Sequence, residues 1–390
     1  MNTIIESYLG PRNPSRAAVG FVLILTEILL IIGIPVSSFA APARGAKGRD
    51  KDKQSIEAAT RLQIFLDRAE FTPGKIDGHY GDFTLKALAL YRQSRGGSDT
   101  PSTDPQKAKL KQEQTPDVSG LDLTSVDPVF TSYTVTEQDL KAVGTVASSL
   151  AAQAKQKSLP YQSAAEAIAE KFHTALAFLE ELNPGKTKSI KAGDVLTVPN
   201  VEPFELTEVK DLVPGSQIAA NDAEARDEPA AAKGKPSSRT RSQDEPKDKP
   251  DSPATGEVAV KVDIPSHMLT VTEGDKLIAA YPVTVGSEHT ASPVGEWKVQ
   301  AVAKLPNFRY DQAMLSHGQR SGNFYLLPPG PNNPVGILWI QLNKKGIGLH
   351  GTNDPDDIGR NASHGCVRLA NWDIVRLAAK VKTGTPVSIH

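Results

Sequence analysis

Apolar positions along the chain fall into three separate stretches, each with its own spacing. In residues 54–95, apolar side chains recur every three or four positions on both sides of the turn-rich segment 73–78. That period is typical of amphipathic helices, so the pattern predicts a helix, a tight turn and a second helix beginning near Thr84. A module of about 40 residues is too small to be an enzyme by itself.

The second stretch mixes two periods. A strand-like run at residues 133–136 is followed by helical spacing at 143–154 and 164–182, and a closing strand within residues 191–200 ends the segment. This order predicts a small α+β module over residues 130–201.

The segments on either side of this module are polar. Residues 97–129 and 202–256 are rich in Pro, Ser, Asp and Lys and poor in aromatic side chains. Such segments bury too little apolar surface to offset chain entropy. We therefore predict a linker at 97–129 and a disordered linker at 202–256.

The third stretch, residues 257–390, reads as a β domain long enough to hold its own core. Runs of branched apolar residues bounded by Gly and Pro predict strands at 258–262, 268–271, 278–285, 295–302 and 337–342. One helix is expected at 371–381 and a closing strand at 385–389. Because Pro386 cannot donate a ladder hydrogen bond, that strand should lie at a sheet edge or begin at the proline.

Residues 1–43 carry the layout of an export signal. Arg12 and Arg16 precede an apolar run at 17–34, and small residues follow it. An uncleaved membrane anchor is the alternative, although Glu27 within the run would be costly in a bilayer. Either interpretation places the rest of the chain in the periplasm or cell wall, with membrane contact only through this segment.

Charge and cysteine content narrow the classes of partner. The chain has 44 basic and 45 acidic residues, a formal net charge of −1, which gives no electrostatic case for binding nucleic acid. Its single cysteine excludes an intramolecular disulfide scaffold and a cysteine-rich zinc finger.

That cysteine is also the centre of the candidate chemistry. Cys366 follows His364 by two residues and His350 by 16. A thiol must lose its proton to attack a carbonyl, and a nearby imidazole is the usual proton acceptor at neutral pH. Gly365 would let backbone N–H groups approach a developing oxyanion. The pattern indicates a cysteine nucleophile activated by histidine.

Other interpretations of these residues exist. A free cysteine can be a small buried hydrophobe, but Gly365 and Arg368 beside it make a poor apolar site. His350, His364 and Cys366 could bind zinc with water as the fourth ligand, although His and Cys two residues apart are not a usual zinc pair. A papain-like protease would carry its cysteine on a helix early in the domain, not near the C-terminus.

The sequence HGTNDPDDIGRNASHGCVRLAN, with SPVGEWKV and GPNNPVG upstream, resembles the signature of the YkuD-type L,D-transpeptidases. The resemblance covers essentially all of residues 257–390. It implies a β-sandwich catalytic domain that needs no metal or organic cofactor. It also implies that Cys366 is the nucleophile, that His350 is the general base, and that the Gly351 carbonyl orients the imidazole.

The resemblance implies further site residues. His364 and Gly365 would frame the oxyanion hole with Cys366, and Ser363 would support that loop. Arg368 would hold a carboxylate of the substrate, a task suited to a guanidinium. Ser363, Thr352 and Asn353 complete the candidate substrate-binding residues.

The implied reaction begins with attack on the carbonyl between the third stem residue and the terminal D-Ala. D-Ala leaves, a thioester remains on the cysteine, and the amine of another stem resolves it as a 3→3 cross-link. If water resolves the thioester, the enzyme is an L,D-carboxypeptidase.

The N-terminal stretches resemble wall-binding modules. LQIFLDRAEFTPGKIDGHYGDFTLKALALYRQ, in residues 54–96, resembles the peptidoglycan-binding domain, although a helical spacer without a ligand is the alternative. YTVT, AIAEKFHTALAFLEELNPG and IKAGDVLTVPN, in residues 130–201, resemble the LysM glycan-binding module, with an extra stretch at 139–163. The implied partners are peptidoglycan stem peptides and glycan strands.

We expect both modules to be joined to the catalytic domain by flexible tethers and only to raise the local substrate concentration. A non-catalytic wall-binding protein, which would keep these modules without needing Cys366 and His350 together, is the other class of function.

Overall fold

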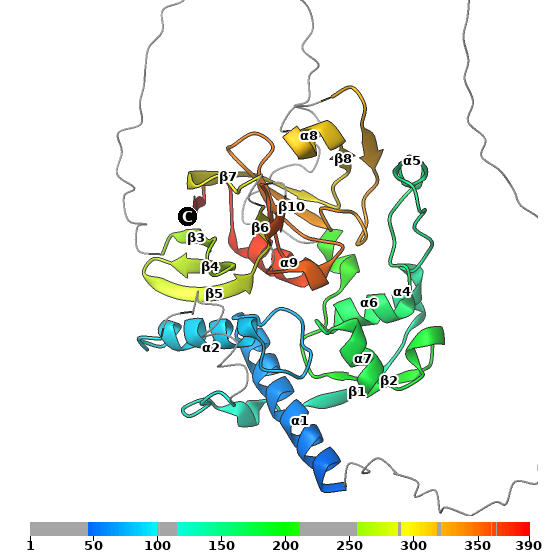
Figure 1. The fold of residues 1–390 in the computed structure, drawn as a ribbon, viewed down its shortest axis with the longest axis vertical. Helices are drawn as coiled ribbons and strands as arrows, with labels where there is room; N and C mark the ends of the chain where they lie inside the picture. The colour runs from blue at the N-terminus through cyan, green and yellow to red at the C-terminus, as the bar shows by residue number, and fades with distance from the viewer. Residues whose placement is uncertain are drawn as a thin grey trace, which may run out of the picture. The chain divides into compact units, whose positions relative to one another are not determined.

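Eight strands in the C-terminal domain hydrogen-bond into one mixed sheet (Figure 1). They are β3 (Val258–Asp263), β4 (Met268–Glu273), β5 (Lys276–Pro282), β7 (Gly295–Lys304), β10 (Leu338–Leu342), β11 (Gly348–His350), β13 (Val367–Arg368) and β14 (Pro386–Ile389). Their spatial order is β13-β11-β10-β7-β14-β3-β4-β5. Two smaller pairs join β6 (Val285–Gly286) to β12 (Asn361–Ser363) and β8 (Phe308–Tyr310) to β9 (Tyr325–Leu327).

The computed structural model describes residues 46–99, 101, 115–210, 256–287, 290–317, 321–359, 361–363 and 365–390. The predicted export signal, most of the 202–256 linker and part of the 97–129 linker lie outside these residues. Within the described ranges, no helix combines the length and apolar character needed to cross a bilayer.

The long strand β7 connects the two layers of the predicted sandwich. Its first four residues pair with β14, and its later residues pair with β10 through a bulge next to Gln341. Because bulges bend strands and increase their twist, one sheet curls around its own core. The predicted β-sandwich domain is confirmed, and its two layers belong to a single curled sheet.

The predicted strands and helix of this domain are confirmed, with ends shifted by a few residues. The helix forms as α9 (Asn371–Lys380). Strand β14 lies between β3 and β7, so it is central. Pro386 is the first residue of β14 and lies opposite Lys298. This confirms the prediction that the strand would begin at the proline if it did not lie at a sheet edge.

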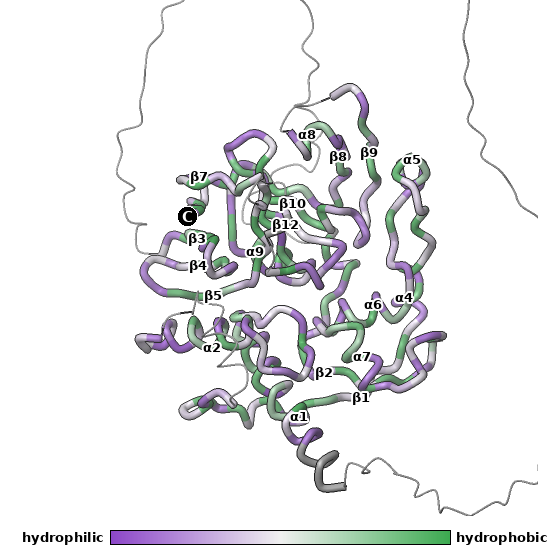
Figure 2. The backbone as a smooth tube through the Cα atoms, in the orientation of Figure 1, coloured by the Kyte–Doolittle hydropathy of each residue, from purple (hydrophilic) through white to green (hydrophobic). Residues whose placement is uncertain are grey.

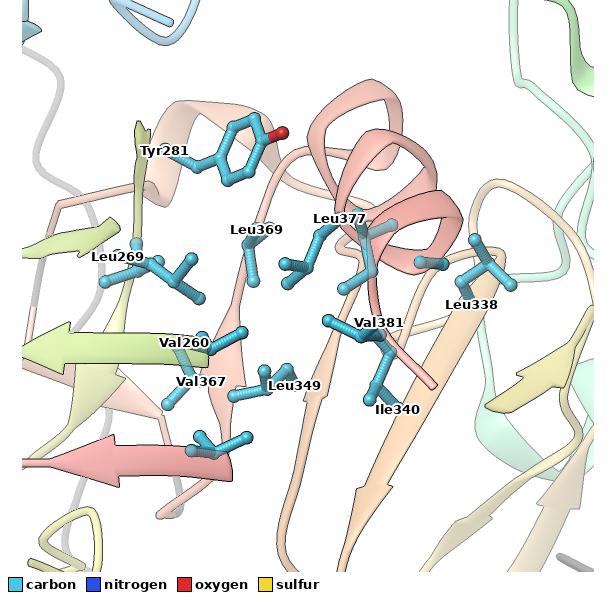
Figure 3. Close-up of a cluster of buried hydrophobic side chains, with 14 of the residues drawn as sticks. Val260, Leu269, Tyr281, Leu338, Ile340, Leu349, Val367, Leu369, Leu377 and Val381 are labelled. Carbon is cyan, nitrogen blue, oxygen red and sulfur yellow. The ribbon is translucent and has the colours of Figure 1, made fainter. Parts of the chain in front are cut away.

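Helix α9 covers the inside of the curled sheet (Figure 3). Ile374, Leu377, Ala378 and Val381 follow helical spacing and are fully buried against strand residues such as Leu349. In Figure 2, hydrophobic residues concentrate along β5 and β10, which contribute to this core. Each fully buried leucine contributes about 1.5–3 kcal/mol, so the core fixes the strands that carry the site.

The N-terminal helical pair forms as α1 (Ala46–Arg68) and α2 (Asp82–Ser94). Leu62, Leu66 and Leu88 share a buried cluster with Met268 and Ala280 of the catalytic sheet. Figure 1 shows α2 running beside β5. The helical segment and the sheet therefore have a common core.

The second N-terminal segment contains two antiparallel strands and four α-helices. These are β1 (Phe130–Thr134), α4 (Glu137–Lys141), α5 (Leu150–Gln153), α6 (Ala164–Lys171), α7 (Leu176–Leu182) and β2 (Val195–Pro199). The order agrees with the predicted α+β module.

Two helix predictions in this segment need correction. Of the stretch 143–154, only α5 is helical, because Gln153 and Gln156 donate side-chain hydrogen bonds to loop carbonyls at 2.7 and 2.6 Å. The stretch 164–182 is broken between α6 and α7, where His173 adopts φ +52°.

Residues 47–390 form one compact unit. Val126 and Val129, in the second half of the predicted 97–129 linker, are buried in the core of the α+β segment. Asp67 of α1 and Glu170 of α6 both bond to residues of α9. The described N-terminal segments are therefore packed on the catalytic domain, which differs from the tethered arrangement expected from the sequence.

Candidate active site

Two adjacent parallel strands bring the motif residues together. In the register of β11 and β13, Leu349 lies opposite Val367 and His350 opposite Arg368. Cys366 immediately precedes β13. Since alternate residues of a strand share a face, Cys366 and Arg368 lie on the same side as His350.

His350 is buried and held on two sides. Its Nδ1–H donates to the Gly351 carbonyl at 2.6 Å, and its ring stacks on Trp339 with centroids 5.2 Å apart and planes 11° apart. The hydrogen bond assigns the proton to Nδ1 and leaves Nε2 as the acceptor. Burial, with a smaller effect from the charge of Arg368, lowers the pKa of His350 to about 3 despite the bond to Gly351.

Cys366 is half-buried, and its Sγ–H donates to the Gly346 carbonyl at 3.5 Å. Burial raises the pKa of the thiol to about 11, although the Gly348 backbone N–H and the charge of Arg368 both act to lower it. Burial therefore keeps thiol and imidazole neutral at pH 7.

The loop before Cys366 is tied to its own backbone. The Ser363 hydroxyl donates to the Cys366 carbonyl at 2.5 Å and accepts the Gly365 N–H at 3.2 Å. Gly365 has φ +105°, a conformation that side chains with a Cβ rarely adopt. These bonds fix the turn that presents the thiol. His364 lies outside the described residues.

Arg368 is anchored through its backbone. Its N–H donates to the Thr284 carbonyl and its carbonyl accepts the Thr284 N–H, at 2.9 and 3.0 Å. The side-chain Nε is buried without a hydrogen-bond partner among the described residues. Burial lowers the pKa of the guanidinium, while the negative charges of Asp354 and Asp357 raise it. The side chain thus retains a donor for an acidic group.

The other two candidate binding residues differ from each other. Thr352 is buried and its hydroxyl accepts the Asp354 N–H at 3.1 Å, so it braces its own turn. Asn353 is exposed at the surface of that turn.

Two neighbours of the histidine were not singled out from the sequence. Trp339 lies opposite His350 in the register of β10 and β11. Asn371 Oδ1 accepts the Ile337 N–H at 3.3 Å, and it would lie 2.2 Å from a Cβ on Gly351. Only glycine fits at position 351 while Asn371 keeps this position. Asn371 is the last residue of the motif HGTNDPDDIGRNASHGCVRLAN. Its place in that motif was the one feature of the sequence that could have indicated its role.

Comparisons with known proteins identify the family of the C-terminal domain. A family model described as the YkuD L,D-transpeptidase catalytic domain matches residues 257–389. A Bacillus licheniformis protein provisionally named L,D-transpeptidase YkuD is 33% identical over 138 residues, covering 35% of this chain and 68% of that protein. YqjB of Bacillus subtilis, named in the same provisional way, is 30% identical over 144 residues, covering 36% and 74%.

Alignments with solved structures are weaker. An L,D-transpeptidase from Mycobacterium smegmatis is 22% identical, with a TM-score of 0.29, over 34% of this chain and 58% of that one. The N-terminal segments described above lie outside the residues matched by the family model.

Proposed function

Because this chain belongs to the YkuD family of L,D-transpeptidases, we propose that it transfers acyl groups between peptidoglycan stem peptides through a thioester on Cys366. The observation that supports this most directly is the bond between His350 and the Gly351 carbonyl, on the strand beside the only cysteine of the sequence. That bond orients the imidazole as a carboxylate does in other catalytic triads.

In the first step, the neutral His350 accepts the thiol proton at Nε2 as Cys366 attacks the carbonyl preceding the terminal D-Ala. Sγ must first turn away from the Gly346 carbonyl to which it now donates. The C–N bond breaks, His350 returns the proton to the departing D-Ala amine, and the acyl group remains on sulfur as a thioester. The Cys366 backbone N–H stabilises the oxyanion, because the Gly365 N–H already donates to the Ser363 hydroxyl.

In the second step, the side-chain amine of another stem attacks the thioester. His350 accepts a proton from this amine and returns it to the departing thiol. The product is a 3→3 cross-link. Attack by water is the second candidate and would give a shortened tripeptide stem. Arg368 binds a substrate carboxylate through its buried, unpartnered donor.

The N-terminal segments and residues 1–43 complete the proposal. Residues 54–96 and 130–201 bind the wall, and residues 1–43 direct export to the cell envelope. Sedimentation of the full chain with purified sacculi, compared with an unrelated protein of similar size, tests wall binding. A fragment beginning at residue 257 is a poor comparison, because removing α1 and α2 would expose Met268 and Ala280.

Mass analysis of muropeptides tests the reaction. The purified chain is incubated with disaccharide-tetrapeptides, and the expected product is a dimer that has lost one D-Ala. Accumulation of tripeptide alone assigns water as the acceptor. If Cys366→Ala still removes or exchanges the terminal D-Ala, the enzymatic proposal is wrong and a wall-binding protein remains.

A further inference from the structure

Glu170 connects the LysM-like segment to the catalytic domain. It lies on α6 with 8% of its surface exposed. Its Oε1 accepts the Tyr161 hydroxyl at 2.6 Å, and its two oxygens lie 3.1 and 3.3 Å from Nδ2 of Asn371. The carboxylate of one segment thus bonds to the first residue of α9 in the other.

This contact sets the direction of the Asn371 amide. Nδ2 points toward Glu170 and Oδ1 points away from it, as the ionised form of Glu170 requires because a carboxylate only accepts hydrogen bonds. Oδ1 then accepts the Ile337 N–H at 3.3 Å. With the amide reversed, its NH₂ group would face the Ile337 N–H, and two donors would oppose each other.

The same amide oxygen lies against the backbone that holds the base. A Cβ on Gly336 or on Gly351 would lie 2.2 Å from Oδ1. The Gly351 carbonyl in turn accepts the Nδ1–H of His350 at 2.6 Å. A continuous set of contacts therefore runs from α6 to the imidazole, over residues far apart in the sequence.

Burying the carboxylate of Glu170 is energetically unfavourable, because the charged form loses its hydration. Burial raises the pKa of Glu170 to about 7, although the bonds from Tyr161 and Asn371 lower it. An apolar side chain of similar size would avoid this cost, so packing alone does not explain a glutamate here.

We propose that Glu170 is a positioning residue for the transpeptidase reaction: it fixes Asn371, and through Asn371 the Gly351 carbonyl that orients His350. The LysM-like segment thereby completes the active site of the catalytic domain. This inference rests on the proposed function.

A matched pair of variants of the full chain tests the role. Glu170→Gln keeps an oxygen acceptor for Asn371, whereas Glu170→Met has a similar length and no comparable acceptor. Kinetics are measured on disaccharide-tetrapeptide, with the rate of acyl-adduct formation on Cys366 followed by intact mass. Glu181→Met, at an exposed position on α7 of the same segment, is the control.

We expect Glu170→Met to lower kcat about tenfold, which is less than the roughly hundredfold or more that a general base contributes, because the variant displaces His350 without removing it. KM should stay within twofold of the wild type. Glu170→Gln should restore kcat to within threefold, and Glu181→Met should match the wild type. If Glu170→Met does not fold, Glu170→Leu takes its place under the same criteria.

Three outcomes would overturn the inference: an apolar variant with wild-type kcat, a loss confined to KM, or a glutamine variant as slow as the methionine variant. In each of these the wild type still forms its adduct, so the proposed function survives. A wild-type chain that forms no adduct on Cys366 removes the proposed function and the positioning role together.

Discussion

Arg376 of α9 forms a two-point ion pair with Asp67 of α1, with Nη1–Oδ1 and Nη2–Oδ2 distances of 3.0 and 2.9 Å. Asp67 is fully buried and also bonds to Nδ1 of His173 at 3.1 Å. Burial alone would raise the pKa of Asp67, but the charge of Arg376 holds it well below its usual range. One carboxylate thus joins the helical pair, the α+β segment and the catalytic domain.

Removing the Asp67 carboxylate should lower the free energy of unfolding of the unit that it joins. Asp67→Ala removes the two-point partner of Arg376 and leaves only the Asp373 carboxyl group, 3.7 Å from Nη1. Breaking a buried pair in this way costs about 3–5 kcal/mol. We expect a lower midpoint in urea denaturation. Glu57→Ala is the control, because the Glu57–Arg61 pair is exposed and should contribute under about 1 kcal/mol. Equal midpoints for Asp67→Ala and the wild type would contradict the joining role.

A second buried carboxylate should make stability depend on pH. Burial raises the pKa of Asp373 to about 8, and its Oδ2 accepts the Thr72 hydroxyl at 3.1 Å. The folded chain then holds a proton that the unfolded chain has released, so stability falls as pH rises from about 4 to 8. Asp373→Asn removes this contribution.

Thermal melts at pH 5, 6.5 and 8 measure the effect. The Tm of Asp373→Asn relative to the wild type should increase at each step. The comparison is made against the wild type at each pH because other groups also contribute. The raised pKa of Glu170 acts in the same direction as Asp373, and the lowered pKa of His350 acts in the opposite direction. Parallel curves for the two proteins would show that Asp373 is ionised in the folded chain at neutral pH.

The Gly351 position should not tolerate a methyl group. A Cβ there would lie 2.2 Å from Asn371 Oδ1, so Gly351→Ala must displace the amide or the carbonyl that holds His350. We expect destabilisation of about 1–3 kcal/mol, as for other overpacked sites, and slower acylation of Cys366. Gly322→Ala is the control, since a Cβ at that position meets nothing within 4 Å. An alanine variant with wild-type stability and rate would refute the close fit.

Periodicity predicted the parts of the fold that are long enough to carry a period. Strands such as β3 and β7, and helix α9, have six to ten residues and a buried face. Strands β11 and β13 have three and two residues, too few for any pattern, yet they hold the candidate site. Their pairing depends on the core beneath them.

The packing of the N-terminal segments could not be predicted for a different reason. Asp67 and Glu170 are charged residues on helices, which normally indicate a solvent-facing surface. Their partners are far away in sequence, with Glu170 and Asn371 separated by 201 positions. Cys366 and His350 could be predicted from the sequence, because both belong to one short motif.

The resting protonation state of the site gives the last prediction. Burial raises the pKa of Cys366 to about 11 and lowers that of His350 to about 3, so we expect no thiolate–imidazolium pair before substrate binds. The rate of iodoacetamide alkylation should then rise about tenfold per pH unit between pH 6 and 9, following the thiolate fraction. Cys366 is the only cysteine in the sequence, so the added mass reports this thiol alone. Acylation of Cys366 by a disaccharide-tetrapeptide needs the base during attack, and His350→Ala should slow it about a hundredfold or more. Alkylation of His350→Ala should stay close to the wild-type rate, because the imidazole does not ionise the thiol at rest. An alkylation rate that is flat from pH 5 to 8, and lost in His350→Ala, would instead demonstrate a preformed ion pair.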